Sequence, residues 1–574
     1  MHKANVTMLA SKETPLNWHT IRWINVNKQV NQLRRRIYRA SARSDLKKAR
    51  NLQKLMIKSF SNKLIAIRRV TQVNQGKRTP GVDKVVVSTA KERSWLLDQL
   101  DMTHMTKVKP IKRAYIPKKN GKERPLGLPT ILDRCRQAMV KSALEPYWEA
   151  KFEATSYGFR PGRSAHDAIK RVHCSLRTGT SRPWILDADI EGAFDHINHD
   201  YLMKTIGASP ARKWIKAWLE SEIIEDKQKI PTIAGTPQGG VISPLLANIA
   251  LHGMEEELDI TYNSRGHIKT TSRYALVRYA DDFVIFSKTK AECEKAKESI
   301  TKWLSIRGLK LSEEKTKIVH IEQGFDFLGF NIRQYRTNRK RKKKVLLCKP
   351  SKASVRSFKK QMKDEWKKTL MWDTKRVIEN LNPKIKGWCN YFRVGTSKET
   401  FKKLDGWMWK RQMRFARRRH PNKHWWWCKK RYWGKIKGWN DKWVFVDTYS
   451  HKELFLWKLA WTPIKRHILV KGRSSPDDPT LRIYWQQRQA NHSKYLFKLR
   501  SILWRKQKGK CLVCYDNIDN GEPIHIHHLK PKKMGGSESL KNLAMIHAEC
   551  HRQVHSKKGS TIAEVRKLLE PYAG

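Results

Sequence analysis

Leu276–Ser287 reads Leu-Val-Arg-Tyr-Ala-Asp-Asp-Phe-Val-Ile-Phe-Ser and places two adjacent carboxylates, Asp281 and Asp282, between two apolar runs. The apolar, β-favouring residues on both sides predict two short strands joined by a tight turn. Adjacent carboxylates repel each other, and keeping both ionised in a folded site is costly unless a cation lies beside them. The stretch therefore predicts a site for a divalent metal, Mg²⁺ first, or a solvated hairpin turn that contains Asp-Asp by chance.

A second acidic stretch lies upstream, where Trp184–His196 reads Trp-Ile-Leu-Asp-Ala-Asp-Ile-Glu-Gly-Ala-Phe-Asp-His. Its apolar start predicts a strand that runs into Asp187 and Asp189. A strand that delivers Asp189 opposite the Asp-Asp turn would complete a site of three carboxylates. Such a site can hold two metal ions about 3.5–4 Å apart, which activate an attacking hydroxyl and stabilise a leaving phosphate oxygen.

In this order and with this separation, Asp189–Asp195 and Tyr279–Asp282 resemble the palm motifs of reverse transcriptases, most closely those encoded by group II introns. The resemblance implies RNA-templated DNA synthesis, with two Mg²⁺ ions held by the three carboxylates. Phe194 stands where the family has an aromatic side chain that packs beneath the sugar and excludes a 2′-hydroxyl, which predicts selectivity for deoxynucleotides. Asp187 and Asp195 are weaker candidates, expected to be structural or hydrogen-bonded.

The composition is strongly basic, with 120 Lys and Arg against 52 Asp and Glu and a formal charge of +68 over 574 residues. This surplus predicts a polyanionic partner and binding that weakens steeply as salt rises. No apolar run reaches the length of a membrane span, so no membrane partner is expected. Met1–Leu16 has no apolar signal region, and nine cysteines do not indicate a disulfide framework. We therefore expect a location in the bacterial cytoplasm near the nucleoid, or in an organellar matrix, without secretion.

Two upstream segments are candidates for nucleotide binding. Arg113–Pro129 has an Asn-Gly pair between two extended arms and predicts a basic β-hairpin. By resemblance to the family's fingers, Lys118 and Arg124 would meet the triphosphate, where cations offset charge on the transferring group. An ordinary basic hairpin is the alternative. Gly235–Pro244 resembles the family's nucleotide-pocket motif, in which glycines let a nucleotide lie against the backbone and Gln238 bonds to a base or sugar.

Other basic residues are candidates for contact with nucleic acid or for proton transfer. Ser156–Ser164 is a glycine- and arginine-containing loop that opens a helix, which suits close approach to a phosphate backbone. The same block occurs in group II intron enzymes, so Arg160 and Arg163 are expected to contact template or primer. Lys315 and Lys317 lie in a segment similar to a further palm motif, and either could protonate the leaving pyrophosphate.

The region after the palm motifs is basic and rich in aromatic residues. Residues 350–420 predict helices, with a turn at Asn382–Pro383. Asn390–Phe392 and its surroundings resemble the thumb, or maturase domain, of intron-encoded proteins. Ser474–Pro479 indicates a linker. Between these segments, residues 430–500 carry no motif with readable chemistry, and their position matches the family's DNA-binding region.

The C-terminal segment contains two pairs of potential metal ligands with two-residue spacers, Cys511/Cys514 and His547/Cys550. This spacing suits a tetrahedral Zn²⁺ site. Histidine stands at position 547 where many relatives have cysteine, so the fourth ligand is the least certain of the set. A purely structural zinc knuckle that binds nucleic acid is the alternative.

The residues between and after these pairs resemble the HNH endonuclease fold, a β-hairpin and a helix around one catalytic metal. The resemblance implies that His528 is the general base that activates water. His527, His551 and His555 would hold a divalent metal at the scissile phosphate. Asn542 would orient the base or its loop. A knuckle alone does not account for these histidines and Asn542.

These features predict an α+β multidomain protein: a right-hand polymerase with fingers and an antiparallel palm sheet, a helical thumb, and a C-terminal ββα-metal HNH module. The expected segments are a basic helical N-terminal extension (1–80), fingers and palm (81–335), thumb and maturase domain (345–425), DNA-binding region (426–500) and HNH domain with its zinc site (501–574). The implied partners are group II intron RNA, target DNA, an RNA template with its DNA primer, and deoxynucleoside triphosphates. The oligomeric state is left open.

The expected function is that of a group II intron-encoded reverse transcriptase that assists splicing and nicks target DNA. Three alternatives remain. A reverse transcriptase of another bacterial retroelement or defence system, without a maturase role, is disfavoured by the maturase-like block and the HNH module. An RNA-dependent RNA polymerase is disfavoured by Phe194, and an RNA chaperone with a decayed palm by the three intact carboxylates.

Overall fold

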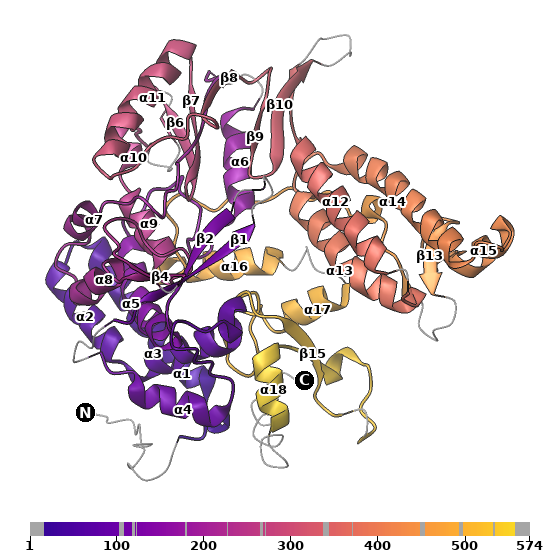
Figure 1. The fold of residues 1–574 in the computed structure, drawn as a ribbon, viewed down its shortest axis with the longest axis horizontal. Coiled ribbons are helices and arrows are strands. Elements are labelled where there is room, and N and C mark those ends of the chain that lie inside the picture. The colour runs from indigo at the N-terminus through magenta and orange to yellow at the C-terminus, as the bar shows by residue number, and fades with distance from the viewer. Residues whose placement is uncertain are drawn as a thin grey trace.

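The computed structural model shows a mixed α/β protein with several separate sheets, each packed against helices (Figure 1). It describes residues 16–102, 108–117, 121, 123–177, 181–226, 228–263, 268–269, 271–336, 344–369, 371–447, 454–492, 498–531 and 534–556. Among these residues no helix combines the length and the apolar character needed to cross a membrane.

The N-terminal region is a group of helices that packs on α5 (Ile131–Glu149). Its elements are η1 (Trp18–Thr20), α1 (Trp23–Ala42), α2 (Leu46–Lys58), α3 (Phe60–Arg68), η2 (Arg69–Val73), η3 (Gln75–Arg78) and α4 (Ala90–Gln99). Val30 and Ile37 of α1 are buried on one helix face, whereas Arg36 on the other side is exposed, as an amphipathic helix requires.

The sheet that carries the acidic motifs has the strand order β6-β7-β3-β8, and its strands are antiparallel. The strands are β3 (Trp184–Asp189), β6 (Ala275–Tyr279), β7 (Asp282–Ser287) and β8 (Lys317–His320). Alternate residues of β7 face opposite sides: Val284 packs with α6 (Ala165–Ser175), and Ile285 packs with α11 (Lys290–Ser305). Both faces are buried, so the period-2 pattern fixes the register and the direction of every side chain.

A second sheet, of order β2-β1-β4-β5, lies beside the first and contains the predicted basic hairpin. Its strands are β1 (Ile111–Pro117), β2 (Glu123–Leu128), β4 (Ile223–Glu225) and β5 (Gln228–Ile230). β1 and β2 are antiparallel, so the two arms are confirmed. Lys118, at the tip, lies outside the described residues. Short helices connect these sheets: α7 (His199–Ile206), α8 (Arg212–Leu219), α9 (Ser243–Ala250) and α10 (Met254–Glu257).

A three-stranded sheet leads into a helical region, seen on the right of Figure 1. The strands are β9 (Phe325–Phe327), β10 (Phe330–Arg336) and β11 (Lys344–Pro350), and the helices are α12 (Lys352–Lys368), α13 (Thr374–Phe392), α14 (Lys398–Arg419) and α15 (Trp425–Tyr432). The turn predicted at Asn382–Pro383 is wrong, because α13 continues through it. Proline removes one helical hydrogen bond. Tertiary contacts hold the helix at this point. The Asn382 side chain donates to Phe455 O and accepts from Trp457 N, both at 2.8 Å. Ile378 and Ile385 are buried on the inner face of the helix.

The remaining chain returns across the molecule and ends in a small two-stranded module. Its elements are β12 (Trp433–Gly434), β13 (Val444–Asp447), β14 (Leu454–Phe455), η4 (Leu459–Trp461), η5 (Pro479–Leu481), α16 (Arg482–His492), α17 (Lys498–Lys506), β15 (Ile524–His528), η8 (Leu540–Asn542), β16 (Leu543–His547) and α18 (Ala548–Ser556). Ser474–Pro479 is not an exposed linker as predicted. Ser475 is fully buried, and Asp477 accepts hydrogen bonds from Arg34 of α1.

Candidate active sites

The first site lies at the turn between β6 and β7. The antiparallel register pairs Asp189 of β3 with Asp282 of β7, and Tyr279 with Asp282 across the hairpin. Ala280 and Asp281 form the turn, where Ala280 has φ of +59°. The register therefore brings the acidic end of β3 directly beside the Asp-Asp turn.

The electrostatics of this site show how closely the carboxylates are placed. Burial raises the pKa of Asp282 to about 8, helped by a side-chain contact with Asp189 and by the charge on Asp281. Burial also raises the pKa of Asp281, and the charge on Asp189 adds to this. Three carboxylates that suppress one another's ionisation fit a cation between them. The carboxylate oxygens of Asp189, Asp281 and Asp282 do not all come within 4.8 Å of one another. Among the described residues, the ligand atoms of two Cys/His groups do.

Two cations border the carboxylates. Lys315 Nζ lies 2.5 Å from Asp189 Oδ2, and this contact raises the pKa of the lysine. Arg124 of β2 is close enough for its charge to favour ionised Asp281. Lys317 pairs in register with Asp187, whose pKa is raised to about 7, mainly by burial. Of the two lysines predicted as proton donors, Lys315 is thus the one in contact with the carboxylate site.

A buried network that the sequence did not reveal supports the turn from behind. Arg278, one residue before Tyr279, is fully buried and donates to Asn248 Oδ1 at 3.2 Å and to Ala280 O at 3.3 Å. It also lies 3.4 Å from Glu153 Oε2. Gly158 packs so tightly against the turn that a Cβ there would lie 3.0 Å from Cα of Ala280, and closer still to its nitrogen. These contacts fix the backbone that carries Asp281.

Arg160 and Arg163 are buried, which corrects the expected contact with template or primer. Arg160 pairs with Glu149 at 2.9 Å, and both side chains are 1% exposed. Arg163 donates to Ala154 O and Gly472 O, both at 2.8 Å. Because these donors are used inside the protein, the two arginines hold the loop in shape.

Two of the nucleotide-pocket candidates, Phe194 and Gln238, contact neighbouring segments of the chain. Phe194 and Phe159 form an edge-to-face pair with ring centres 6.2 Å apart. Gln238 Nε2 donates to Asp195 Oδ2 at 2.9 Å, and Gln238 O accepts from Gly127 N of β2 at 2.7 Å. The Gly-rich loop therefore connects β2 to the Phe194 segment, and Asp195 is hydrogen-bonded as expected.

The second site is a metal-ligand cluster in the C-terminal module. Cys511, Cys514, His547 and Cys550, hereafter the Cys₃His cluster, are all buried, with one ligand atom each within 4.8 Å of one another. His547 Nδ1 lies 3.4 Å from Cys514 Sγ, so the histidine belongs to the cluster. Three sulfurs and one imidazole nitrogen around a common centre are a donor set that fits Zn²⁺.

The third site adjoins the Cys₃His cluster on the same hairpin and helix. His527 of β15 and His551 and His555 of α18 also bring one nitrogen each within 4.8 Å of one another. His525 was not among the predicted residues, yet its Nδ1 lies 3.3 Å from His551 Nδ1. The alternation of β15 places it on the same strand face as His527, a signal that the sequence does contain. The three predicted histidines are thus brought together by two elements.

His528 and Asn542 occupy the edge of the third site. His528 Nε2 lies 3.5 Å from Glu538 Oε2. Asn542 spans the intervening loop: its Oδ1 accepts from Lys530 N at 2.6 Å, and its Nδ2 donates to Ser537 O at 2.7 Å. The asparagine therefore orients the loop between the two strands, the structural half of its expected role.

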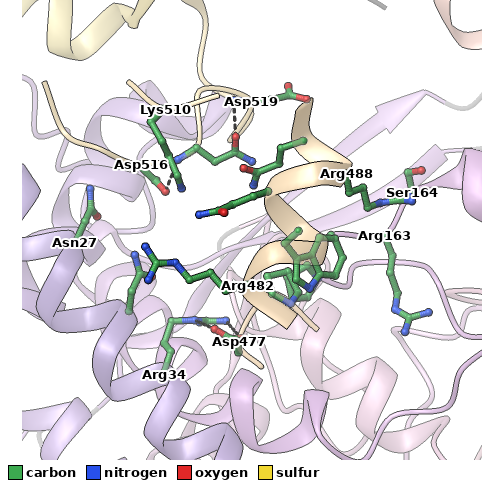
Figure 2. Close-up of a pocket in the computed structure, with 18 of the residues that line it drawn as sticks. Asn27, Arg34, Arg163, Ser164, Asp477, Arg482, Arg488, Lys510, Asp516 and Asp519 are labelled. Atoms are coloured by element: carbon green, nitrogen blue, oxygen red, sulfur yellow. Dashed lines mark hydrogen bonds and ion pairs between the residues drawn. The ribbon is translucent and has the colours of Figure 1, made fainter. Parts of the chain in front are cut away.

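A large cavity of about 1350 Å³ lies where α1, α13, α16 and the loop of the Cys₃His cluster meet. Figure 2 shows Asn27 and Arg34 on the α1 side, with Lys510, Asp516 and Asp519 on the facing loop. The positive charge of Arg34 is balanced by ion pairs with Asp477 and Glu145. The described residues that line the cavity include ten Lys and Arg against six Asp and Glu, and this excess of positive charge suits a phosphate-bearing ligand.

Four family models match the chain. Residues 116–332 match "reverse transcriptase (RNA-dependent DNA polymerase)", and residues 18–100 match the N-terminal domain of reverse transcriptase. Residues 355–433 match the maturase-specific domain of group II introns, and residues 511–557 match HNH endonuclease. Fold, sites and matches together define a reverse transcriptase joined to an HNH endonuclease.

Three similar proteins narrow the family to which the chain belongs. Protein YkfC of Escherichia coli (strain K12) is 38% identical over 300 residues, which cover 46% of this chain and 78% of YkfC. The group II intron-encoded protein LtrA of Lactococcus lactis subsp. cremoris is 32% identical over 369 residues, 50% of this chain and 61% of LtrA. An uncharacterized 91 kDa protein in the cob intron of Schizosaccharomyces pombe is 27% identical, over 49% of this chain and 43% of that protein. The chain belongs to the group II intron-encoded reverse transcriptases that carry maturase and HNH domains.

Proposed function

We propose that the chain synthesises DNA on an RNA template at the carboxylate site, which would be the palm of a right-hand polymerase. The observation that carries this proposal is the register that sets Asp189 opposite Asp282, beside the Asp281 turn. In this role the three carboxylates bind two Mg²⁺ ions, which supply activation of the primer 3′-hydroxyl and stabilisation of the leaving oxygen.

The surrounding residues then act on the nucleotide. Arg124, near Asp281, neutralises triphosphate charge that develops on the leaving side. Phe194 packs beneath the sugar and excludes a 2′-hydroxyl, which makes the enzyme selective for deoxynucleotides. Lys315 is the preferred donor of a proton to pyrophosphate, because it is the one of the two candidate lysines whose ammonium lies beside the carboxylate site. Lys118, at the hairpin tip, is proposed as a further triphosphate contact on the resemblance alone.

We further propose that the C-terminal module nicks target DNA. His527, His551 and His555 hold a divalent metal at the scissile phosphate, and His528 accepts the proton of the attacking water. Burial, reinforced by the neighbouring histidines, lowers the pKa of His527 to about 4, so this ring is neutral and able to ligate a metal at physiological pH. The Cys₃His cluster binds a structural Zn²⁺.

The partners follow from the same assignment. Intron RNA would bind the basic surfaces of the N-terminal helices and of α12–α14, proposed as the thumb and maturase domain. The region between residues 426 and 500 would bind target DNA. The formal charge of +68 supports extensive contact with phosphates, and we expect both affinities to fall steeply with salt. The nicked strand would supply the primer for DNA synthesis.

Paired variants test the two activities against each other in one full-length protein. Asp281→Ala is expected to abolish primer extension on an RNA template while nicking of target DNA and splicing support survive. His528→Ala is expected to abolish nicking while primer extension survives. Each variant is the folding control for the other. Normal extension by Asp281→Ala would refute the palm assignment, and normal nicking by His528→Ala would refute the endonuclease assignment.

A further inference from the structure

Arg68, the last residue of α3, reaches into the Cys₃His cluster of a module that lies more than four hundred residues downstream. Its Nη2 donates to Cys550 Sγ at 3.0 Å. The same nitrogen lies 3.7 Å from Glu522 Oε2, and the guanidinium stacks 4.5 Å from the ring centre of Trp23. Arg68 is only 7% exposed. A buried guanidinium needs compensating partners, and both the sulfur of Cys550 and the carboxylate of Glu522 come from the C-terminal module.

The charge of a loaded cluster explains why an arginine is placed there. Zn²⁺ with three thiolates and one neutral imidazole carries a net charge of −1. All four ligand residues are buried, and a buried net charge is costly unless an opposite charge lies beside it. Arg68 is positively charged and hydrogen-bonded to one of the thiolate sulfurs, which is the strong, charge-assisted form of the bond.

The contact lies within a broader interface between the N-terminal helices and the module. Asn27 Nδ2 of α1 donates to Cys514 O at 2.9 Å, the carbonyl of a second cluster residue. Gln72 donates to Glu549 of α18 at 3.1 Å, and Gln553 donates to Ile21 O at 3.1 Å. Buried apolar residues of both parts belong to one continuous core. Figure 1 shows α18 beside the N-terminal helices.

We propose that Arg68 is the charge partner of a zinc ion in the Cys₃His cluster, so that metal binding and docking of the C-terminal module onto the N-terminal helices are coupled. Zinc holds Cys514 and Cys550 where Asn27 and Arg68 meet them. Docked Arg68 in turn stabilises the metal-loaded cluster. The coupling is reciprocal: loss of either partner weakens the other by the same factor. It ties a nicking module rigidly to a polymerase without any catalytic role for Arg68 itself.

The first test measures zinc retention in the full-length, zinc-loaded protein with a chromophoric chelator. Arg68→Met keeps the apolar stem but removes the charge and the donor, and we expect zinc affinity to fall about 10- to 100-fold, as for loss of other outer-shell partners. Arg68→Lys keeps the charge and is expected to lie between Arg68→Met and wild type. Gln72→Ala is the comparison variant, because it removes an interface hydrogen bond that does not involve sulfur; its zinc affinity should fall less than that of Arg68→Met.

Cobalt substitution separates a role at the sulfur from general loosening of the interface. A hydrogen bond lowers the energy of thiolate electrons, so its loss in Arg68→Met should shift the sulfur-to-cobalt charge-transfer band to longer wavelength. The Gln72→Ala spectrum should match wild type. If Arg68→Met binds zinc as tightly as wild type and its cobalt spectrum is unshifted, the proposal is overturned.

The second test needs no substitution, so it holds even if an Arg68 variant folds poorly. Hydrogen exchange is compared between zinc-loaded and chelator-stripped wild type. We expect stripping to speed exchange in α3 and at the start of α1 as well as in α18, while α12 and α13 stay protected. Unchanged protection of α3 and α1 after zinc removal would show that the cluster and the docking are independent, contrary to the proposal.

Discussion

Gly158 provides a sharp test of how the carboxylate turn is held in place. Gly158→Ala adds one methyl group that would lie 3.0 Å from Cα and Cβ of Ala280 and closer still to Ala280 N. Separations under 3.0 Å are not tolerated, and the obstacle is backbone, so the turn must move back by roughly half an ångström or the loop must open. Overpacking of this kind costs about 1–3 kcal/mol of folding stability.

The displaced residue directly precedes Asp281, so the substitution should act on polymerisation. Misplacement by 1 Å at a catalytic group can lower a rate about 100-fold, and a shift of half that size predicts a fall in kcat for primer extension of about 10-fold or more. Target nicking should stay at the wild-type rate, because the nearest atoms that the added methyl would meet all belong to Ala280 and none to the module with His528.

Gly406→Ala is the matched control. Gly406 lies within α14, and a Cβ there would meet nothing within 4 Å. The same chemical change should leave extension unaffected and stabilise the helix by up to about 1 kcal/mol. The measurements are steady-state primer extension on an RNA template, nicking of duplex DNA and thermal unfolding of both variants. If Gly158→Ala extends primers as fast as Gly406→Ala, the close packing behind Asp281 does not position it, and the reasoning is refuted.

Two further predictions concern buried ion pairs. Arg160→Met leaves Glu149 buried and unpaired, so we expect a loss of about 3–5 kcal/mol in stability; the double variant Arg160→Met/Glu149→Leu should recover much of it. The salt dependence of RNA affinity should not change, whereas a slope reduced by about one would restore the rejected role of Arg160 as a phosphate contact. Burial opposes ionisation of Asp167, but His467 and Arg488 outweigh it and hold its pKa at about 2. A lowered carboxyl pKa gives stability that is present above the unfolded value and lost as pH falls from about 4 towards 2, here about 2 kcal/mol. Asp167→Asn should therefore be less stable than wild type at pH 5 and nearly equal at pH 2, as measured by urea unfolding; a constant difference across that range would contradict the assignment.

Local patterns in the sequence were sufficient for the elements that carry the site. Apolar, β-favouring runs on both sides of the Asp281–Asp282 pair predicted β6, the turn and β7, and the apolar start before Asp189 predicted β3. The Cys511–Cys514 and His547–Cys550 spacers predicted a cluster that the structure assembles. In each case the informative residues are neighbours along the chain, so their geometry follows from strand and turn periodicity.

The failures arise where a distant partner decides the outcome. Pro383 predicts a turn by itself, but Asn382 is anchored to residues more than seventy positions away and α13 continues. Arg163 lies in a loop whose glycines and arginines suggest a phosphate contact, yet its guanidinium donates to the carbonyl of Gly472. Arg278 looks like one polar residue in an apolar strand, and its partner Glu153 lies 125 positions away in the sequence. Local propensity cannot identify such tertiary partners.

The central claim is that Asp189, Asp281 and Asp282 share divalent metal ions, and anomalous diffraction from crystals of the full chain grown with Mn²⁺ measures this directly. The account predicts two manganese peaks about 3.5–4 Å apart between these carboxylates, with Lys315 moved away from Asp189. A separate peak at His527, His551 and His555 would serve as the internal positive control. Manganese at the histidines but none between the three carboxylates would contradict the account.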